Sequence, residues 1–136
     1  MMRPYSQVLE KIRSAGLRPT RQRLALAKLL FGEKDRHVTA ENLYTEARSK
    51  KIRVALATVY NTLHQFTEAG LLRKIVVDTA RTYFDTNTRH HHHFYCQKKG
   101  QLLDAPAGAI SINKIPAVPE GMAIKRVDVI VHIEEK

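Results

Sequence analysis

The chain contains a single cysteine, Cys96, among its 136 residues. One cysteine cannot form an intramolecular disulfide, and one chain cannot then supply the four thiolates of a four-cysteine structural zinc site. The composition therefore fits a protein of a reducing compartment.

Long hydrophobic runs are also absent from the sequence. No stretch approaches the roughly 20 apolar residues that a membrane-spanning helix needs. The N-terminal sequence MMRPYSQVLEKIRSAG lacks the apolar centre of a secretion signal. We therefore expect a cytoplasmic protein without a membrane partner.

Acidic residues are fewer than basic ones, 13 against 23, and the imbalance is uneven along the chain. Residues 1–85 carry 16 Lys and Arg against 8 Asp and Glu, a net charge of +8, whereas residues 86–136 carry 7 against 5, a net charge of +2. Such a concentrated positive charge is typical of proteins that bind nucleic-acid phosphates. An anionic membrane surface or simple solubility would also account for it, so charge alone leaves these alternatives open.

The first part of the chain has the pattern of a winged helix. Apolar spacing and capping residues predict four helices: residues 4–15, a helix capped by Thr20 and ending before Gly32, a short helix capped by Thr39, and a helix from about Ala57 to Gly70. Two β-rich runs then flank the turn residues Asp78, Thr79 and Ala80 and predict a hairpin.

The fourth predicted helix has two different faces. Val59, Leu63 and Phe66 recur at helical spacing and should face the core. The opposite side then carries polar and aromatic groups: Thr58, Tyr60, Asn61 and His64. Such a face suits base edges and phosphates in a DNA major groove, and a solvated polar face is the alternative.

The last part of the chain, residues 86–136, is predicted to be rich in β-structure. A strand through the histidines, a turn near Lys98 to Gly100 and a strand ending at Asp104 are followed by a proline-containing linker and a last strand, VDVIVHI, over residues 127–133. Three strands in about 50 residues bury too little to be stable alone, so we expect this part to dimerise.

Four consecutive histidines, His90 to His93, carry the strongest chemical signal. Their position in the middle of the chain argues against a purification tag. On a strand, His91 and His93 would share one face, and His90 and His92 the other. Imidazole binds Fe, Mn, Zn and Cu and also serves as an axial ligand of haem iron. Asp85 and Asp104 are near enough in sequence to complete a nitrogen and oxygen ligand set, whereas the isolated His132 is expected to be an ordinary strand residue.

Five segments spread over nearly the whole chain form an ordered series: GLRPTRQR, HVTAENLY, ATVYNTLHQFTEAGLL, YFDTNTRHHHHFYC and GQLLD. They resemble the successive signature segments of the ferric uptake regulator (Fur) family. Within it, the sequence most resembles the iron response regulator (Irr) branch, including its shortened C-terminal end, PEGMAIKRVDVIVHI.

This resemblance implies an α+β protein. Its N-terminal winged helix-turn-helix domain would cover residues 1–85, and a small β-rich dimerisation and sensing domain would cover residues 86–136. The resemblance also implies a transcription regulator, mainly a repressor and not an enzyme, that binds AT-rich double-stranded DNA operators as a homodimer.

The family pattern places six residues of this chain at the DNA: Arg18, Arg21, Arg23, Thr58, Tyr60 and Asn61. Arg18 matches a position where a basic side chain enters the minor groove, and Arg21 and Arg23 are expected at phosphates. Tyr60 is the best candidate for a base contact, through thymine methyl groups. For Arg23, a salt bridge within the protein is the alternative.

The family's regulatory metal site lies between the two domains, and every position of its ligand pattern is filled here: His37, Asp85, His91, His93 and Asp104. The resemblance thus implies a divalent ion, Fe, Mn or Zn. An ion shared by both domains would favour one relative orientation and so couple metal binding to DNA affinity, typically by about 1 to 3 kcal/mol.

Two departures from the family pattern affect the cofactor prediction. Lys99 stands where the second cysteine of a structural zinc pair would be, and Val127 stands where a second metal site has its distal histidine. His90 and His92 are therefore available for haem or a second metal. In the Irr branch, haem relieves DNA binding, which implies a protein of haem biosynthesis as a further partner.

Two other hypotheses remain open. Asp104 resembles the peroxide-sensing branch of the family, in which bound Fe(II) drives oxidation of a ligand histidine, so a peroxide-sensing metal-dependent repressor is the alternative function. A hydrolytic metalloenzyme is a weaker third hypothesis, since histidines and carboxylates can activate a metal-bound water but no further nucleophile or substrate motif is present.

Overall fold

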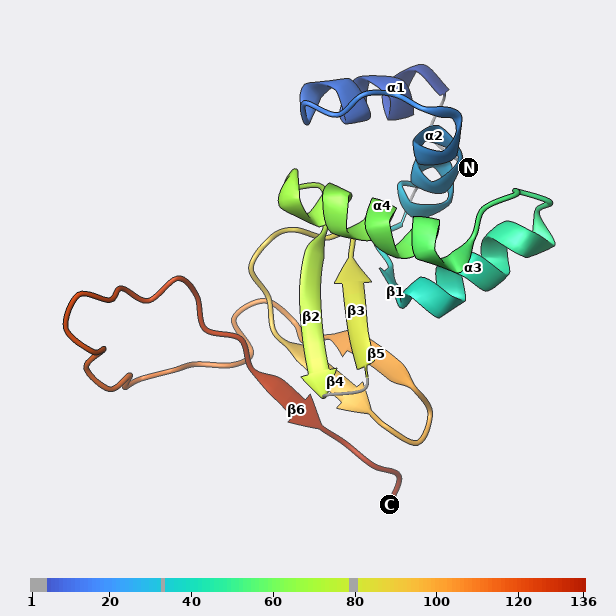
Figure 1. Ribbon diagram of the computed structural model, residues 1–136. Helices are drawn as coiled ribbons and strands as arrows, with labels where there is room; N and C mark the ends of the chain where they lie inside the picture. The colour runs from blue at the N-terminus through green and yellow to red at the C-terminus, as the bar shows by residue number, and fades with distance from the viewer. Residues whose placement is uncertain (1–4, 33, 79–80) are drawn as a thin grey trace. The chain divides into compact units, whose positions relative to one another are not determined.

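The computed structural model describes residues 5–32, 34–78 and 81–136. The chain forms two compact units, Met1–Thr88 and Arg89–Lys136 (Figure 1). Among the described residues, no helix has the length and apolar character needed to cross a membrane.

The described part of the first unit contains the predicted helices and hairpin and one additional short strand. Its elements are α1 (Tyr5–Ser14), α2 (Arg21–Leu30), β1 (His37–Val38), α3 (Ala40–Ser49), α4 (Leu56–Glu68), β2 (Arg73–Asp78) and β3 (Arg81–Asp85). The predicted turn residues Thr79 and Ala80 lie outside the described residues.

The predicted helix starts are confirmed by their hydrogen bonds. The Thr20 hydroxyl accepts a bond from the Arg23 backbone N–H, at 3.1 Å, and so caps α2. Thr39 and Asn42 form a capping box at α3, because each side chain accepts a bond from the other's backbone N–H, at 3.0 and 3.3 Å. These side chains satisfy backbone donors that a helix leaves unpaired at its first turn.

The end of α4 is also as predicted. Gly70 has a φ of +82°, in the left-handed region that favours glycine. Its N–H donates to the Thr67 carbonyl at 3.0 Å, and the N–H of Leu71 donates to the Phe66 carbonyl at 2.9 Å. This pair of bonds is the Schellman motif, which satisfies carbonyls at the last turn of a helix.

The helices of the first unit meet in one apolar core. Val59, Leu63 and Phe66 of α4 are fully buried there, which confirms the predicted inner face. They pack with residues of the other helices and of the sheet, among them Val8, Ile12, Leu26, Leu30, Leu43 and Phe84. The predicted outer face of α4 is exposed at Tyr60, Asn61 and His64 and partly exposed at Thr58.

The sheet of the first unit has the order β1-β3-β2, with both neighbouring pairs antiparallel. The predicted hairpin is the β2–β3 pair. The sequence analysis missed β1, because a strand of two residues after a polar segment is too short to show alternation. In its register, His37 lies opposite Asp85 and Val38 opposite Phe84.

The second unit contains β4 (His93–Cys96), β5 (Gln101–Asp104) and β6 (Ile130–His132). The sheet order is β5-β4-β6, with β5 antiparallel and β6 parallel to β4. Residues 105–129, all described, contain no helix or strand, and Figure 1 shows them as a long irregular segment before β6. The prolines in this segment lack the N–H that a regular ladder or helix needs.

Two of the strand predictions for this unit, the strand through the histidines and the last strand, were too long. The strand expected to pass through all four histidines begins only at His93. Beside it, the imidazole Nδ1 of His92 accepts the Val129 N–H at 3.1 Å, so a side chain replaces the backbone acceptor there. The last strand covers three residues of the seven predicted, because only residues 130–132 pair with β4.

The second unit exposes much of its apolar surface. Leu103 of β5 is 45% exposed and Met122 is 67% exposed, while Tyr95 of β4 is buried. Further exposed apolar residues are Ile112, Ile115, Val118, Ile124 and Ile133. This agrees with the expectation that three short strands bury little, and dimerisation remains a prediction.

Candidate metal and DNA sites

The first candidate half-site is the pair His37 and Asp85, which the β1–β3 register places directly opposite each other. His37 Nε2 lies 3.1 Å from Asp85 Oδ2. The Asp85 side chain is fully buried, and its other oxygen, Oδ1, accepts the Asn87 backbone N–H at 2.9 Å. One carboxylate oxygen is thus held by the backbone while the other faces the imidazole.

The second half-site is built in the same way in the second unit. His93 of β4 lies opposite Asp104 of β5, and His93 Nε2 is 3.4 Å from Asp104 Oδ1. His91 Nε2 lies 3.0 Å from the same oxygen. The rings of His91 and His93 have centroids 4.4 Å apart, so the predicted sharing of one face by these two histidines is confirmed.

A hydrogen bond sets the proton position of His91. Its Nδ1 lies 2.6 Å from the Arg89 carbonyl oxygen. A carbonyl can only accept, so Nδ1 is the donor in this bond, and Nε2, on the Asp104 side, is the ring nitrogen that could bind a metal. Metal-binding histidines commonly donate their second ring N–H in this way, which fixes the ring for coordination.

The donors of both half-sites fit a divalent transition metal. Metal bonds of about 2.0 to 2.2 Å place neighbouring ligand atoms about 3 Å apart or slightly more. The nitrogen-to-oxygen distances of 3.1 Å in the first half-site and of 3.0 and 3.4 Å in the second have this spacing. Mixed imidazole and carboxylate ligands suit Fe, Mn and Zn.

His90 and His92 form the other pair expected from the alternation, with ring centroids 5.1 Å apart. Both rings bind the backbone before β6. His90 Nε2 donates to the Val127 carbonyl at 2.9 Å, and His92 Nδ1 accepts the Val129 N–H at 3.1 Å. These histidines therefore attach the C-terminal segment to the start of β4. The isolated His132 lies in β6, and its ring and that of Tyr95 form an edge-to-face contact.

The outer face of α4 presents Tyr60 as an aromatic ring. The side chain is 39% exposed, and its hydroxyl donates a hydrogen bond to Glu41 Oε1 of α3 at 3.3 Å. The Glu41 charge raises the pKa of Tyr60 above its ordinary value. The ring also stacks on His64, with centroids 6.1 Å apart. Its apolar ring, rather than its hydroxyl, is therefore the part best placed for a new contact.

The three N-terminal arginines expected at DNA differ in their surroundings. Arg18 and Arg21 are exposed. Arg23 is half-buried, and its guanidinium donates to Gln65 Oε1 of α4 at 2.9 and 3.3 Å and to the Arg18 carbonyl at 2.8 Å. These acceptors are neutral amide and carbonyl oxygens, so the bonds differ from the salt bridge of the alternative prediction. Arg23 thus connects α2 with α4.

The sequence analysis missed a basic loop that runs from the last turn of α3 toward α4 and consists of Arg48, Lys50, Lys51 and Arg53. All four side chains are exposed. Three of them, with Tyr44, Ile52 and Val54, line a hollow of about 510 Å³. The signal was present as four cations within RSKKIR, just before the fourth predicted helix.

Comparison with known proteins identifies relatives over most of the chain. Residues 14–132 match the sequence pattern of the Ferric uptake regulator family. The chain is 32% identical to the "Peroxide-responsive repressor PerR" of Staphylococcus epidermidis over 71% of this chain and 63% of that protein. It is 34% identical to the "Peroxide operon regulator" of Bacillus subtilis over 72% of this chain and 67% of that protein. The match thus spans about two thirds of these relatives' length.

Solved structures support the same fold. The ferric uptake regulator of Vibrio cholerae matches with a TM-score of 0.70 and 21% identity, covering 91% of this chain and 96% of that one. The regulator of Pseudomonas aeruginosa, solved with manganese, matches with a TM-score of 0.67 and 23% identity, covering 93% and 96%. The α+β prediction, with a winged helix and a β-rich C-terminal part, is therefore confirmed.

These findings confirm the family and correct the branch. The relatives named above are peroxide regulators, so the resemblance to the Irr branch is not supported. Members of the family are transcription regulators, which agrees with the expectation of a regulator rather than an enzyme. With a family match from residue 14 to residue 132, the chain belongs to the ferric uptake regulator family.

Proposed function

We propose that this chain is a metal-dependent repressor that responds to peroxide. Five side chains, namely three imidazoles and two carboxylates, would hold one divalent ion: His37, Asp85, His91, His93 and Asp104. The observation that carries the proposal is the repeated construction, since each unit forms a His–Asp pair across neighbouring strands. The peroxide-regulator relatives support the choice of signal.

The division of the donors explains why an ion would change DNA affinity. The first unit offers one imidazole and one carboxylate, and the second offers two imidazoles and one carboxylate. Neither half-site alone completes the four or more ligands that these metals commonly take. An ion that needs both half-sites stabilises only those conformations in which the two half-sites lie together. It thereby shifts the population toward those conformations and toward their DNA affinity.

The histidines of the two half-sites are the expected targets of peroxide. Bound Fe(II) would supply one-electron chemistry with peroxide beside the imidazoles. In the net reaction, the C–H of one imidazole carbon becomes C–OH, and hydrogen peroxide, which supplies this oxygen atom, is reduced to one molecule of water. The ring gains one oxygen atom, about 16 Da, and His37 and His91 are the candidates. An oxidised ring is a poorer ligand, so the ion and the associated DNA affinity would be lost.

Mass spectrometry tests this proposal directly. Fe(II)-loaded protein is exposed to peroxide, digested and analysed for the oxygen adduct, with Mn(II)-loaded protein as the matched control. We expect the adduct on His37 or His91 only with Fe(II), together with loss of operator binding. Full operator affinity and no adduct after peroxide would exclude peroxide sensing while leaving the family assignment intact.

A haem response is the competing hypothesis, because His90 and His92 lie outside the five-residue set. His90 Nε2 and His92 Nδ1 bind the backbone at residues 127 and 129, so haem ligation through either atom would first displace this segment. A gel shift at one fixed salt concentration compares metal-free, Mn(II)-loaded and haem-loaded protein. Release of DNA by haem from the Mn(II)-loaded protein would favour haem over peroxide.

The proposed partner is an AT-rich DNA duplex, bound by a homodimer. The outer face of α4, including Thr58, Tyr60 and Asn61, would enter the major groove, while Arg18 would enter the minor groove and Arg21 and the basic loop would contact phosphates. Dimerisation would use the second unit, whose outer strands and exposed apolar side chains offer a surface to a second copy. Sedimentation with and without a duplex would measure the stoichiometry.

A further inference from the structure

Arg36 comes directly before the candidate ligand His37, and its backbone is bonded to the residue after Asp85. The Arg36 N–H donates to Thr86 Oγ1 at 2.8 Å, and the Thr86 N–H donates to the Arg36 carbonyl at 3.1 Å. The two residues therefore lie beside the His37–Asp85 pair on adjacent strand ends. A change in the separation of His37 and Asp85 must also strain or move this pair of bonds.

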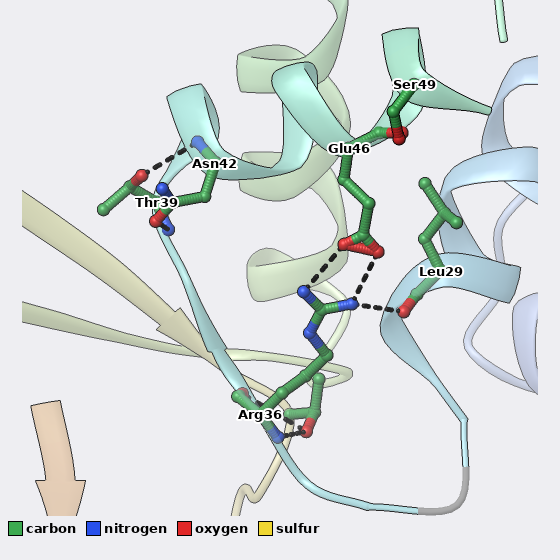
Figure 2. Close-up of polar contacts among 7 residues, drawn as sticks. Leu29, Arg36, Thr39, Asn42, Glu46 and Ser49 are labelled. Atoms are coloured by element: carbon green, nitrogen blue, oxygen red, sulfur yellow. Dashed lines mark hydrogen bonds and ion pairs between the residues drawn. The ribbon is translucent and has the colours of Figure 1, made fainter. Parts of the chain in front are cut away.

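The Arg36 side chain extends away from the strand to two helices (Figure 2). Its Nη1 donates to the Leu29 carbonyl, in the last turn of α2, at 2.8 Å. Nη1 and Nη2 also donate to the two carboxylate oxygens of Glu46, in α3, at 2.9 and 2.8 Å. One residue thus contacts the β1–β3 ladder, α2 and α3.

The Arg36–Glu46 contact has the geometry of a strong ion pair. It is bidentate, which restricts the orientation of both side chains as well as their distance. The side chains are 33% and 26% exposed, so water screens them less than a pair on the open surface. Because Arg36 donates hydrogen bonds to Glu46, the pKa of the Glu46 carboxyl is lowered from its ordinary value.

The route from Glu46 to the DNA-binding surface is short. Glu46 lies within α3, which packs against α4 through the shared core of Leu43, Ala47, Val59 and Leu63. The start of α3 is held by the Thr39–Asn42 capping box, also drawn in Figure 2, only two residues after His37. A rigid connection from the β1 strand to α3 would therefore also set the position of α4.

We propose that Arg36 is a positioning residue that transmits the state of the His37–Asp85 half-site to the DNA-binding helices through its ion pair with Glu46. This inference rests on the proposed metal-dependent repressor function and adds a route for the signal. Breaking the ion pair should leave the metal ligands in place and still allow DNA binding. It should reduce the factor by which metal strengthens that binding.

The test compares Glu46→Gln with the wild-type protein. The variant keeps the length of the side chain and one acceptor oxygen but removes the charge and the second acceptor. Glu10→Gln is the matched control, because Glu10 is a carboxylate of the same unit that, among the described residues, accepts a hydrogen bond from the nearby Ser14 within α1 and lies outside α3. The DNA probe is a duplex that the Mn(II)-loaded wild-type protein selects from a pool of random AT-rich sequences.

Three quantities are measured at one salt concentration: the duplex Kd without metal, the duplex Kd with saturating Mn(II), and the Kd for Mn(II) alone. In Glu46→Gln, we expect the metal-free duplex Kd and the Mn(II) Kd to stay within about 3-fold of the wild-type values. The gain in duplex affinity on adding Mn(II) should fall by about 3-fold to 10-fold. The control should keep the full gain.

The exchanged pair, Arg36→Glu with Glu46→Arg, adds a rescue experiment. It restores opposite charges in reversed positions, so it should recover part of the gain lost in Glu46→Gln. If Glu46→Gln does not fold, Arg36→Lys replaces it, since lysine keeps the charge but loses the bidentate contact. Thermal melts of the metal-free proteins verify folding.

The possible outcomes separate the two proposals. A wild-type protein whose duplex affinity ignores Mn(II) would overturn the proposed function, and the inference with it. A normal wild-type gain that Glu46→Gln fully retains would overturn only the role of Arg36. An equal loss of metal-free and Mn(II)-loaded duplex affinity would show that the ion pair serves stability alone, which also overturns the inference.

Discussion

The two units build the same kind of candidate metal half-site on very different frameworks. In the first unit, capped helices and a common core surround the His37–Asp85 pair, and the Asp85 side chain is fully buried. The second unit consists of three short strands and a long irregular segment, with His93 on β4, Asp104 on β5 and His91 just before β4, and the Asp104 side chain is 40% exposed. The first half-site is thus part of a folded core, whereas Asp104 of the second is open to solvent.

Removing each carboxylate in turn should give the largest contrast between the units. Asp85→Ala leaves buried polar partners without their acceptor, which we expect to cost about 2 to 4 kcal/mol of unfolding free energy even without metal. Asp104→Ala should cost less, about 1 kcal/mol, because the Asp104 side chain is itself 40% exposed and water can replace it beside the buried His91 and His93. Both variants should bind Mn(II) more weakly.

Urea denaturation in a chelator and Mn(II) titration measure these two effects separately. Equal destabilisation by both substitutions would show that the half-sites do not differ in their structural role. Unchanged Mn(II) affinity in either variant would remove that carboxylate from the ligand set.

The second prediction assigns base recognition to the first unit. Tyr60→Ala should weaken specific duplex binding by about 1 to 3 kcal/mol, because it removes the exposed ring that would contact base methyl groups. Tyr60→Phe keeps the ring and loses only the bond to Glu41, so its affinity should stay close to the wild-type value. Fluorescence anisotropy with specific and scrambled duplexes distinguishes the variants, and an equal loss in both would indicate that the hydroxyl matters.

A third prediction concerns phosphate contacts and uses the second unit as its control. The triple variant Arg48→Ala, Lys51→Asn and Arg53→Ala should reduce the slope of log affinity against log salt by about 2 to 3, roughly 0.9 for each lost phosphate contact. Asparagine is chosen because residue 51 has a φ of +60°, which asparagine tolerates. The control triple removes exposed cations of the second unit: Lys98→Ala, Lys114→Ala and Lys125→Ala.

Affinity measured at several salt concentrations gives both slopes. The control slope should equal that of the wild-type protein. Equal reductions in the two triple variants would mean that net charge, rather than the basic loop, governs binding.

The smallest expected effect is the pH dependence of the Arg36–Glu46 ion pair. The pKa of Glu46 is lowered from its ordinary value of 4.5, first by the Arg36 hydrogen bonds. A carboxyl whose pKa is lower in the folded state stabilises the protein above its unfolded-state pKa, and this contribution disappears as the pH falls through the folded-state value. We expect about 1 kcal/mol or less, because the carboxylate is partly exposed.

Urea denaturation of the wild-type protein and Glu46→Gln from pH 7 to pH 3 tests this. The difference in unfolding free energy should be constant near neutral pH and shrink below pH 4.5. A difference that stays the same across this range would show that the Glu46 charge contributes nothing.

Local signals in the sequence predicted much of the first unit. Thr20 and Thr39 predict helix starts, and Gly70 predicts the end of α4, because a cap involves atoms only a few residues apart. The buried face of α4 follows from apolar spacing alone. The second unit was predicted less well, since its last strand depends on pairing with residues about 40 positions earlier in the chain.

By itself, the sequence determined the helix boundaries, the hairpin, the family and the identity of the candidate ligands, since caps, periodicity and ordered motifs are local properties. Tertiary structure alone decided that the two-residue strand β1 brings His37 against Asp85, that Arg23 bonds to Gln65, and that Arg36 joins Glu46 and Leu29. These contacts join residues that are up to 48 positions apart in the chain, as with His37 and Asp85, and they depend on how helices and strands pack. Residue types and their spacing do not specify that packing, because the same side chains could reach several partners until the core places them.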